Sequence, residues 1–86
     1  MKNNNTIIKN LGNSIRQKRH YLGLSQTELA LMAEVSLNFI SQIELGKETV
    51  QLNKLLKVMT CLGLQFTLED GNSGISIKSH ELQEHK

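Results

Sequence analysis

The chain has 86 residues, 38% hydrophobic and 3% aromatic, so it suffices for one small domain with an aliphatic core. A single cysteine excludes an internal disulfide framework, and no apolar run is long enough for a membrane span or signal peptide. The net charge is +2, but residues 1–27 contain five Lys and Arg residues and no acidic residue. This basic segment is either a solvated helix face or a surface for a polyanion such as DNA. The single cysteine and the lack of a long apolar run lead us to expect a cytoplasmic protein.

The first predicted element is a helix over residues 7–22, after a polar N-terminus at residues 1–6 that we expect to be flexible. Its apolar residues recur at helical spacing: Ile8, Leu11, Ile15 and Leu22. Gly12 costs this helix about 1 kcal/mol relative to alanine, which we attribute to close packing against a neighbour. Gly23 is a typical helix terminator, so the helix should end there.

Two short helices with a tight turn between them are predicted over residues 25–46. Ser25 and Glu28 form an S-x-x-E capping box, which starts a helix at Gln26. Ser36 is a second N-cap candidate, so the next helix should cover residues 37–45 and end before Gly46. The side chains expected to be buried in this motif are Leu29, Ala30, Val35, Ile40 and Ile43.

A further helix is predicted over residues 51–62, because apolar side chains again recur at helical spacing before Gly63. Those expected to face inward are Leu52, Leu55, Leu56, Met59 and Leu62. Cys61, in the last turn of this helix, is interpreted as a small packing residue.

After Gly63 the apolar period changes to two, which predicts a half-buried strand over residues 64–69 with Leu64, Phe66 and Leu68 on one face. Such a strand needs a partner. The partner is either residues 75–77 of the same chain or the same strand of a second copy. We favour the second copy, because the link is loose and residues 75–77 are short. Residues 70–86 are otherwise expected to be a flexible tail.

The polar face of the second short helix suggests DNA recognition. Two helices joined in this way form a helix-turn-helix, in which the second helix enters the major groove. The outward residues are Ser36, Leu37, Asn38, Ser41 and Gln42. Amides pair with adenine, and a leucine packs on a thymine methyl group. Gln26 lies at a helix N-terminus where a phosphate would bind, and Lys47 and Lys54 are further candidates for backbone contacts.

Residues 11–64, with the core GLSQTELA…VS…FISQIELGK, resemble the Cro/C1-type (Xre) helix-turn-helix domains of phage and bacterial repressors. The resemblance implies a mainly α, lambda-repressor-like domain of four or five helices over residues 7–63. It also implies binding of double-stranded operator DNA, usually as a homodimer. The family's DNA contacts correspond to Ser36, Leu37, Asn38 and Ser41, and its phosphate contact corresponds to Gln26.

The segment FISQIELGKETVQLNKLLKVMTCLGLQFTLED, with its strand directly after the last helix, resembles the HipB-like antitoxins more narrowly. This resemblance implies that the strand, through Leu64, Phe66 and Leu68, joins two subunits. It also implies repression of the protein's own operon and binding of a HipA-like serine/threonine kinase toxin.

Two departures from the family pattern concern the turn and the DNA-facing helix. Glu34 stands where the motif usually has glycine. Either this glutamate adopts a positive φ, at a cost of about 1 kcal/mol, or the turn is built differently. Leu37 and Asn38 replace the glutamines or lysines frequent there, so the operator sequence cannot be taken from relatives.

Three alternatives remain open: a stand-alone repressor without a toxin, a protein-interaction module that does not bind DNA, and a small helical bundle that merely resembles the motif. An enzyme is not expected, nor a metal, cofactor or small-molecule substrate, because the three histidines and the cysteine lack metal-ligand spacing and there is no glycine-rich phosphate loop. These residues are His20, His80, His85 and Cys61. Glu28, Glu44 and Glu48 are interpreted as a capping residue, a helix-end charge and a loop charge.

Overall fold

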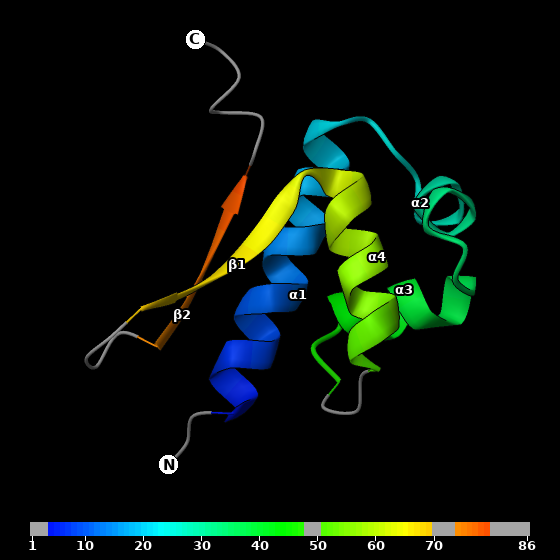
Figure 1. The fold of residues 1–86 in the computed structure, drawn as a ribbon. Coiled ribbons are helices and arrows are strands. Elements are labelled where there is room, and N and C mark those ends of the chain that lie inside the picture. Colours follow the sequence, from blue (N-terminus) through cyan, green and yellow to red (C-terminus); the bar gives the residue numbers. More distant parts are fainter. Residues whose placement is uncertain (1–3, 48–50, 70–73, 80–86) are drawn as a thin grey trace, which may run out of the picture.

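The computed structural model describes residues 4–47, 51–69 and 74–79. Its elements, in chain order, are α1 (Asn4–Tyr21), α2 (Gln26–Ala33), α3 (Leu37–Glu44), α4 (Leu52–Leu62), β1 (Leu64–Glu69) and β2 (Gly74–Ser79). The helices gather into one bundle, and the two strands form a hairpin that extends away from it (Figure 1). The mainly α fold with four helices is confirmed. No helix among the described residues is both long and apolar enough to cross a membrane.

The core lies where α1, α2, α3 and α4 meet, and it is aliphatic as the composition requires. Its fully buried large side chains are Ile15, Leu29, Ile40, Ile43, Val58, Met59 and Leu62. Two residues of α4 depart from the sequence prediction: Leu52 and Leu56 are 62% and 45% exposed. The buried stripe of α4 runs instead through Leu55, Val58, Met59 and Leu62, since a helix packed on one side buries a single narrow face.

Gly12 allows α1 to approach α3 closely. A Cβ built on Gly12 would overlap with the backbone carbonyl oxygen of Ile43. The close packing expected from the sequence is therefore confirmed, and this contact sets the distance between α1 and the C-terminal half of α3. The helix-ending residues Gly23 and Gly63 both have positive φ, 73° and 72°, as a left-handed helix terminus requires.

The partner of β1 is β2 of the same chain, in antiparallel register from Leu64 opposite Ser79 to Glu69 opposite Gly74. The prediction that β1 pairs with the same strand of a second copy is therefore wrong for the edge of β1 that β2 occupies. The four-residue link, 70–73, is of ordinary hairpin length, and β2 is longer than the predicted residues 75–77.

The structure also corrects the bounds of the two segments predicted to be flexible. Residues 74–79 belong to β2 rather than to a flexible tail, and α1 begins at Asn4, inside the predicted N-terminal segment 1–6. The remainder of those predictions, at residues 1–3, 70–73 and 80–86, lies outside the described residues.

Candidate nucleic-acid interface

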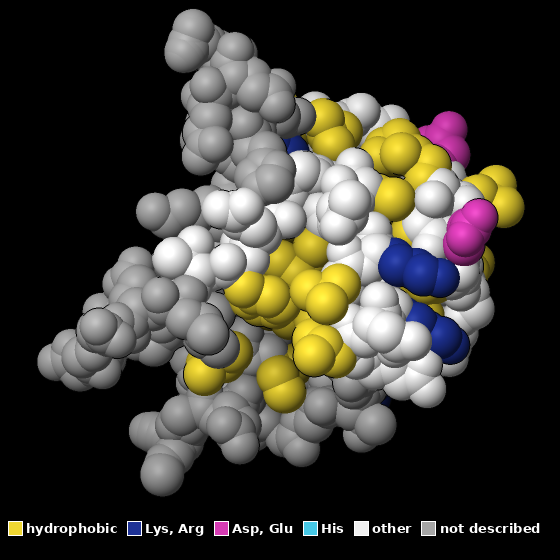
Figure 2. Space-filling view, viewed as in Figure 1, with side chains coloured by type: hydrophobic (Ala, Val, Ile, Leu, Met, Phe, Trp, Pro, Cys, Tyr) yellow, Lys and Arg dark blue, Asp and Glu magenta, His cyan; other side chains and the backbone are white. Residues whose placement is uncertain are grey.

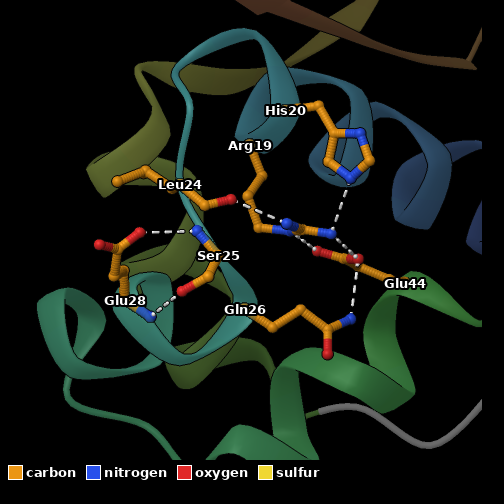
Figure 3. Close-up of polar contacts among 7 residues, drawn as sticks. All are labelled: Arg19, His20, Leu24, Ser25, Gln26, Glu28 and Glu44. Carbon is orange, nitrogen blue, oxygen red and sulfur yellow. Dashed lines mark hydrogen bonds and ion pairs between the residues drawn. The ribbon is translucent and has the colours of Figure 1, made fainter.

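The two helices of the motif begin at the caps that the sequence predicts. The hydroxyl oxygen of Ser25 accepts from the backbone N–H of Glu28 at 3.0 Å, and the N–H of Ser25 donates to the Glu28 carboxylate at 2.8 Å (Figure 3). At the start of α3, the Ser36 hydroxyl accepts from the N–H of Phe39 at 3.0 Å. These bonds satisfy backbone donors that a helix start leaves unpaired, and so they fix where α2 and α3 begin.

The turn between α2 and α3 contains a glutamate in a conformation that favours glycine. Glu34 has φ 60° and ψ 44°, and it is the one non-glycine residue with positive φ in the described part of the chain. The N–H of Val35 donates to the carbonyl of Ala30 at 3.0 Å, which closes the turn. Of the two alternatives for this turn, the one in which the glutamate adopts a positive φ is therefore confirmed. The turn keeps the shape that glycine usually provides, and Glu34 carries a strain of about 1 kcal/mol.

A buried ion pair joins α1 to α3. Arg19 donates from Nε to Oε2 of Glu44 at 2.7 Å and from Nη2 to Oε1 at 2.9 Å (Figure 3). Its Nη1 also donates to the carbonyl oxygen of Leu24 at 2.8 Å, just before α2. The side chains of Arg19 and Glu44 are 9% and 4% exposed. Two parallel hydrogen bonds of this kind fix both the distance and the orientation of the two helices.

Gln26 adds α2 to this network, because its Nε2 donates to Oε1 of Glu44 at 3.0 Å. Burial raises the pKa of Glu44, but the hydrogen bonds from Arg19 and Gln26, with the charges of Arg19 and Arg16, outweigh burial and lower that pKa. The hydrogen bond to Glu44 raises the pKa of Arg19 further. Glu44 is therefore ionised at neutral pH and holds α1, α2 and α3 together.

Glu44 is the last residue of α3, in agreement with its sequence interpretation as a helix-end charge, but that interpretation did not include the buried ion pair with Arg19. One signal for its partner was present: Arg19 follows Leu11 and Ile15 at steps of four residues, which places it on the buried face of α1. An arginine on that face requires a buried acceptor. Which acidic residue supplies it depends on how α1 and α3 cross, 25 residues apart in sequence.

The predicted DNA-binding residues on α3 lie together. Ser36, Leu37 and Asn38 are exposed at its start, while Ser41 and Gln42, one turn later, are partly buried. Residues four apart share a helix face, so these side chains form one continuous surface. We call the surface formed by Ser36, Leu37, Asn38, Ser41 and Gln42 the α3 face.

Two further predicted contacts surround the α3 face. Lys47, which follows α3 after Leu45 and Gly46, is exposed. Lys54 of α4 lies with its Nζ 5.8 Å from the centre of the Phe39 ring, so a cation–π contact holds it beside α3. Gln26 is partly buried and already bonded to Glu44, which leaves one N–H and its carbonyl oxygen for another partner.

Of the three predicted dimerisation residues, the structure describes the side chains of Leu64 and Phe66, and neither is fully exposed. Leu64 is 8% exposed and belongs to the protein's own core, and Phe66 is partly buried against that core. The side chain of Leu68 lies outside the described residues. Leu64 and Phe66, together with Leu56, border an open groove of about 320 Å³ between α4 and β1. Hydrophobic side chains gather over α4 and the start of the hairpin on the face shown in Figure 2.

Cys61 and the histidines do not assemble into a reactive centre within the described residues. No group of three or more His, Cys, Asp or Glu side chains that could hold a metal occurs among them. Cys61 is partly buried, and burial, followed by the charge of Glu34, raises the pKa of its thiol. Its packing against the core agrees with the sequence interpretation. His80 and His85 lie outside the described residues.

Comparison with known proteins identifies a family and a relative of this chain. A family model described as "Helix-turn-helix" matches residues 15–68, from the middle of α1 into β1. The chain is also 43% identical over 53 residues to an uncharacterized HTH-type transcriptional regulator, y4mF, of Sinorhizobium fredii, which covers 62% of this chain and 70% of that protein.

Proposed function

Since the chain belongs to the helix-turn-helix family, we propose that it is a transcription repressor that binds double-stranded operator DNA with α3 in the major groove. The observation that carries this proposal is the α3 face, whose exposed Leu37 and Asn38 project from a helix held rigidly by Glu44. A recognition helix must keep its orientation when it enters the groove. The network of Arg19, Gln26 and Glu44 provides that constraint from the protein side.

Phosphate contacts are proposed on both sides of the α3 face. The Glu44 carboxylate only accepts hydrogen bonds, so it fixes the Gln26 amide with nitrogen toward Glu44. The second N–H of that nitrogen, with the amides at the start of α2, supplies donors for a phosphate. Lys47 provides positive charge after the C-terminal end of α3, and Lys54 provides it beside Phe39, near the N-terminal end. Ser36 and Ser41 contribute hydroxyl groups.

We further propose that the protein acts as a homodimer, because repressors of this architecture recognise two half-sites about 34 Å apart. The apolar surface over α4 and β1 supports this proposal: Leu52 and Leu56 are 62% and 45% exposed beside the groove that Phe66 borders. Among the described residues, the hairpin also leaves the outer edge of each strand without a strand partner. Equilibrium sedimentation tests the dimer, and Leu56→Glu should shift it toward monomer.

The proposed biological role is that of an antitoxin in a HipBA-like operon, which represses its own operon and binds a HipA-like serine/threonine kinase toxin. The sequence resemblance over the motif, α4 and β1 supports this role. We place the protein in the bacterial cytoplasm, with the nucleoid when bound to DNA. The alternative is a stand-alone Xre-type repressor. Co-expression with the product of the neighbouring gene, followed by affinity purification, distinguishes the two: a co-purified kinase supports the antitoxin, and its absence supports the stand-alone repressor.

DNA binding is tested by retardation of the protein's own promoter fragment at low salt. The expected affinity falls steeply with salt, because phosphate contacts release counterions. The variant Asn38→Ala/Ser41→Ala should lose sequence-specific binding, whereas Asn53→Ala, an exposed change on α4, should keep it. Unchanged affinity in the first variant would favour the protein-interaction module instead.

A further inference from the structure

The helix proposed to enter the major groove lacks the side chains that usually recognise guanine and cytosine. Residues 37–44, all described, read LNFISQIE and contain no lysine or arginine. Lysine and arginine form the commonest specific contacts with guanine, and aspartate or glutamate accepts from cytosine. The acidic residue of α3 is Glu44, whose oxygens accept from Arg19 and Gln26 and whose side chain is 4% exposed. Glu44 is therefore not available to cytosine.

The hydroxyl oxygen of Ser36, at the start of α3, is also engaged in a hydrogen bond within the protein. The Ser36 hydroxyl accepts the N–H of Phe39, so its role is to cap the helix, with its own O–H left to donate. The side-chain amides of Asn38 and Gln42 do not cap the helix, and they lie one turn apart on the same face of α3. An amide side chain matches the donor and acceptor pair that adenine presents in the major groove.

Leu37 is an apolar side chain in the middle of this polar surface. It is the first residue of α3, it is 48% exposed, and its sequence neighbours Ser36 and Asn38 are polar and exposed. The N-terminal residues of a recognition helix are those that reach the base edges. In the major groove, the apolar group that a leucine can cover is the 5-methyl group of thymine.

On the basis of the proposed function, we infer that the α3 face selects A·T base pairs, with Leu37 packed on a thymine methyl group and Asn38 and Gln42 on adenines. The engagement of Glu44 and of the Ser36 oxygen within the protein carries this inference beyond the residue types alone, because it removes the carboxylate that would accept from cytosine. The hydroxyl groups of Ser36 and Ser41 that remain can contact any base and so do not oppose a preference for A·T.

The first test is selection of bound sequences from random duplex DNA by the purified full-length protein. The base pairs at which Leu37→Ala or Asn38→Ala relaxes the selection are those that the α3 face contacts, and they should be A·T. Selection of G·C at those positions would overturn the inference while leaving DNA binding intact. Failure to select any sequence would overturn the proposed function together with the inference.

The second test replaces each thymine of the selected site by deoxyuridine, which removes the methyl group alone. The thymines are replaced one at a time, and in each half-site one such replacement should by itself weaken wild-type binding about fourfold, the factor expected from burial of a single methyl-sized group. The Leu37→Ala variant should bind the thymine site and the deoxyuridine-substituted site equally well. The control Leu45→Ala, at a 69% exposed leucine just after α3, should keep the fourfold difference. A wild-type protein insensitive to every replacement, or a difference retained by Leu37→Ala, would contradict the role of Leu37.

Discussion

The motif at residues 25–46 and the C-terminal hairpin are held in different ways. In the motif, side-chain caps define both helix starts, and the buried Arg19–Glu44 pair fixes α3 against α1. In the hairpin, β1 is held by backbone pairing with β2 and by Leu64 in the core. The comparison shows that side-chain hydrogen bonds set the geometry of the proposed DNA-binding part, whereas apolar burial and strand pairing attach the hairpin.

The largest expected effect in this comparison comes from breaking the buried ion pair. Glu44→Ala leaves the guanidinium of Arg19 buried without its carboxylate, and Gln26 without its acceptor. Loss of one partner of a buried pair lowers the free energy of unfolding by about 3 to 5 kcal/mol. Chemical denaturation followed by circular dichroism measures this change.

The double variant Arg19→Met/Glu44→Leu is the control for this prediction, because it removes both charges. It should lose much less free energy of unfolding than Glu44→Ala. A double variant at least as unstable as the single variant would show that shape, rather than the unpaired charge, determines the loss.

The same pair predicts how stability depends on pH. Since the pKa of Glu44 is lower in the folded protein than in the unfolded chain, ionised Glu44 stabilises the fold at neutral pH. This stabilisation should be lost as the pH falls through the carboxylate range, below about 4. Glu44→Gln should flatten this part of the profile of unfolding free energy against pH.

The next effect concerns the attachment of the hairpin. Leu64→Ala creates a cavity at a side chain that is 8% exposed, and it should lower the free energy of unfolding by about 2 to 4 kcal/mol. Leu31→Ala, the same change at a 74% exposed site, should cost less than about 0.5 kcal/mol. The loss at Leu64 should be independent of protein concentration. A loss that grows with concentration would place Leu64 in a subunit interface instead.

The helices were predictable from the sequence because their start and stop signals are local. Ser25 with Glu28, Ser36 and Gly63 each act within four residues, and each helix boundary falls within a few residues of its prediction. The partner of β1 was not predictable in the same way. A strand pattern shows that Leu64 faces a core, but it does not specify which other strand pairs with it.

The α3 face was predictable for the same reason, since helical spacing and the cap at Ser36 place Asn38 and Gln42 on one side. The network behind it was not. Glu44 meets Arg19 and Gln26 because of how three helices cross, and no local pattern contains that information. The sequence therefore predicts which residues are presented, while the structure shows what holds them there.

A smaller effect tests the local caps of the motif. Ser25→Ala removes the acceptor for the Glu28 N–H and should cost about 1 kcal/mol of unfolding free energy. The neighbouring exposed change Thr27→Ala serves as the control and should be nearly neutral. Equal losses in the two variants, measured by thermal unfolding, would mean that the capping box does not define the start of α2.

The smallest effect is a stabilisation in the turn. Glu34→Gly relieves the strain of a positive φ, and the gain is partly offset by the greater freedom of glycine in the unfolded chain. The net result should be an increase in unfolding free energy of up to about 1 kcal/mol. Glu34→Ala removes the same carboxylate but keeps the strain, so an equal gain in that variant would attribute the effect to charge.

The most direct test of the proposed DNA recognition is a titration of ¹⁵N-labelled protein with its promoter fragment, in which the amide chemical shifts are measured at each step. We expect the largest changes at residues 36–42 and at the N-terminus of α2, with small changes in β1 and β2. Large changes confined to the hairpin, with α3 unaffected, would contradict the proposal that α3 enters the major groove.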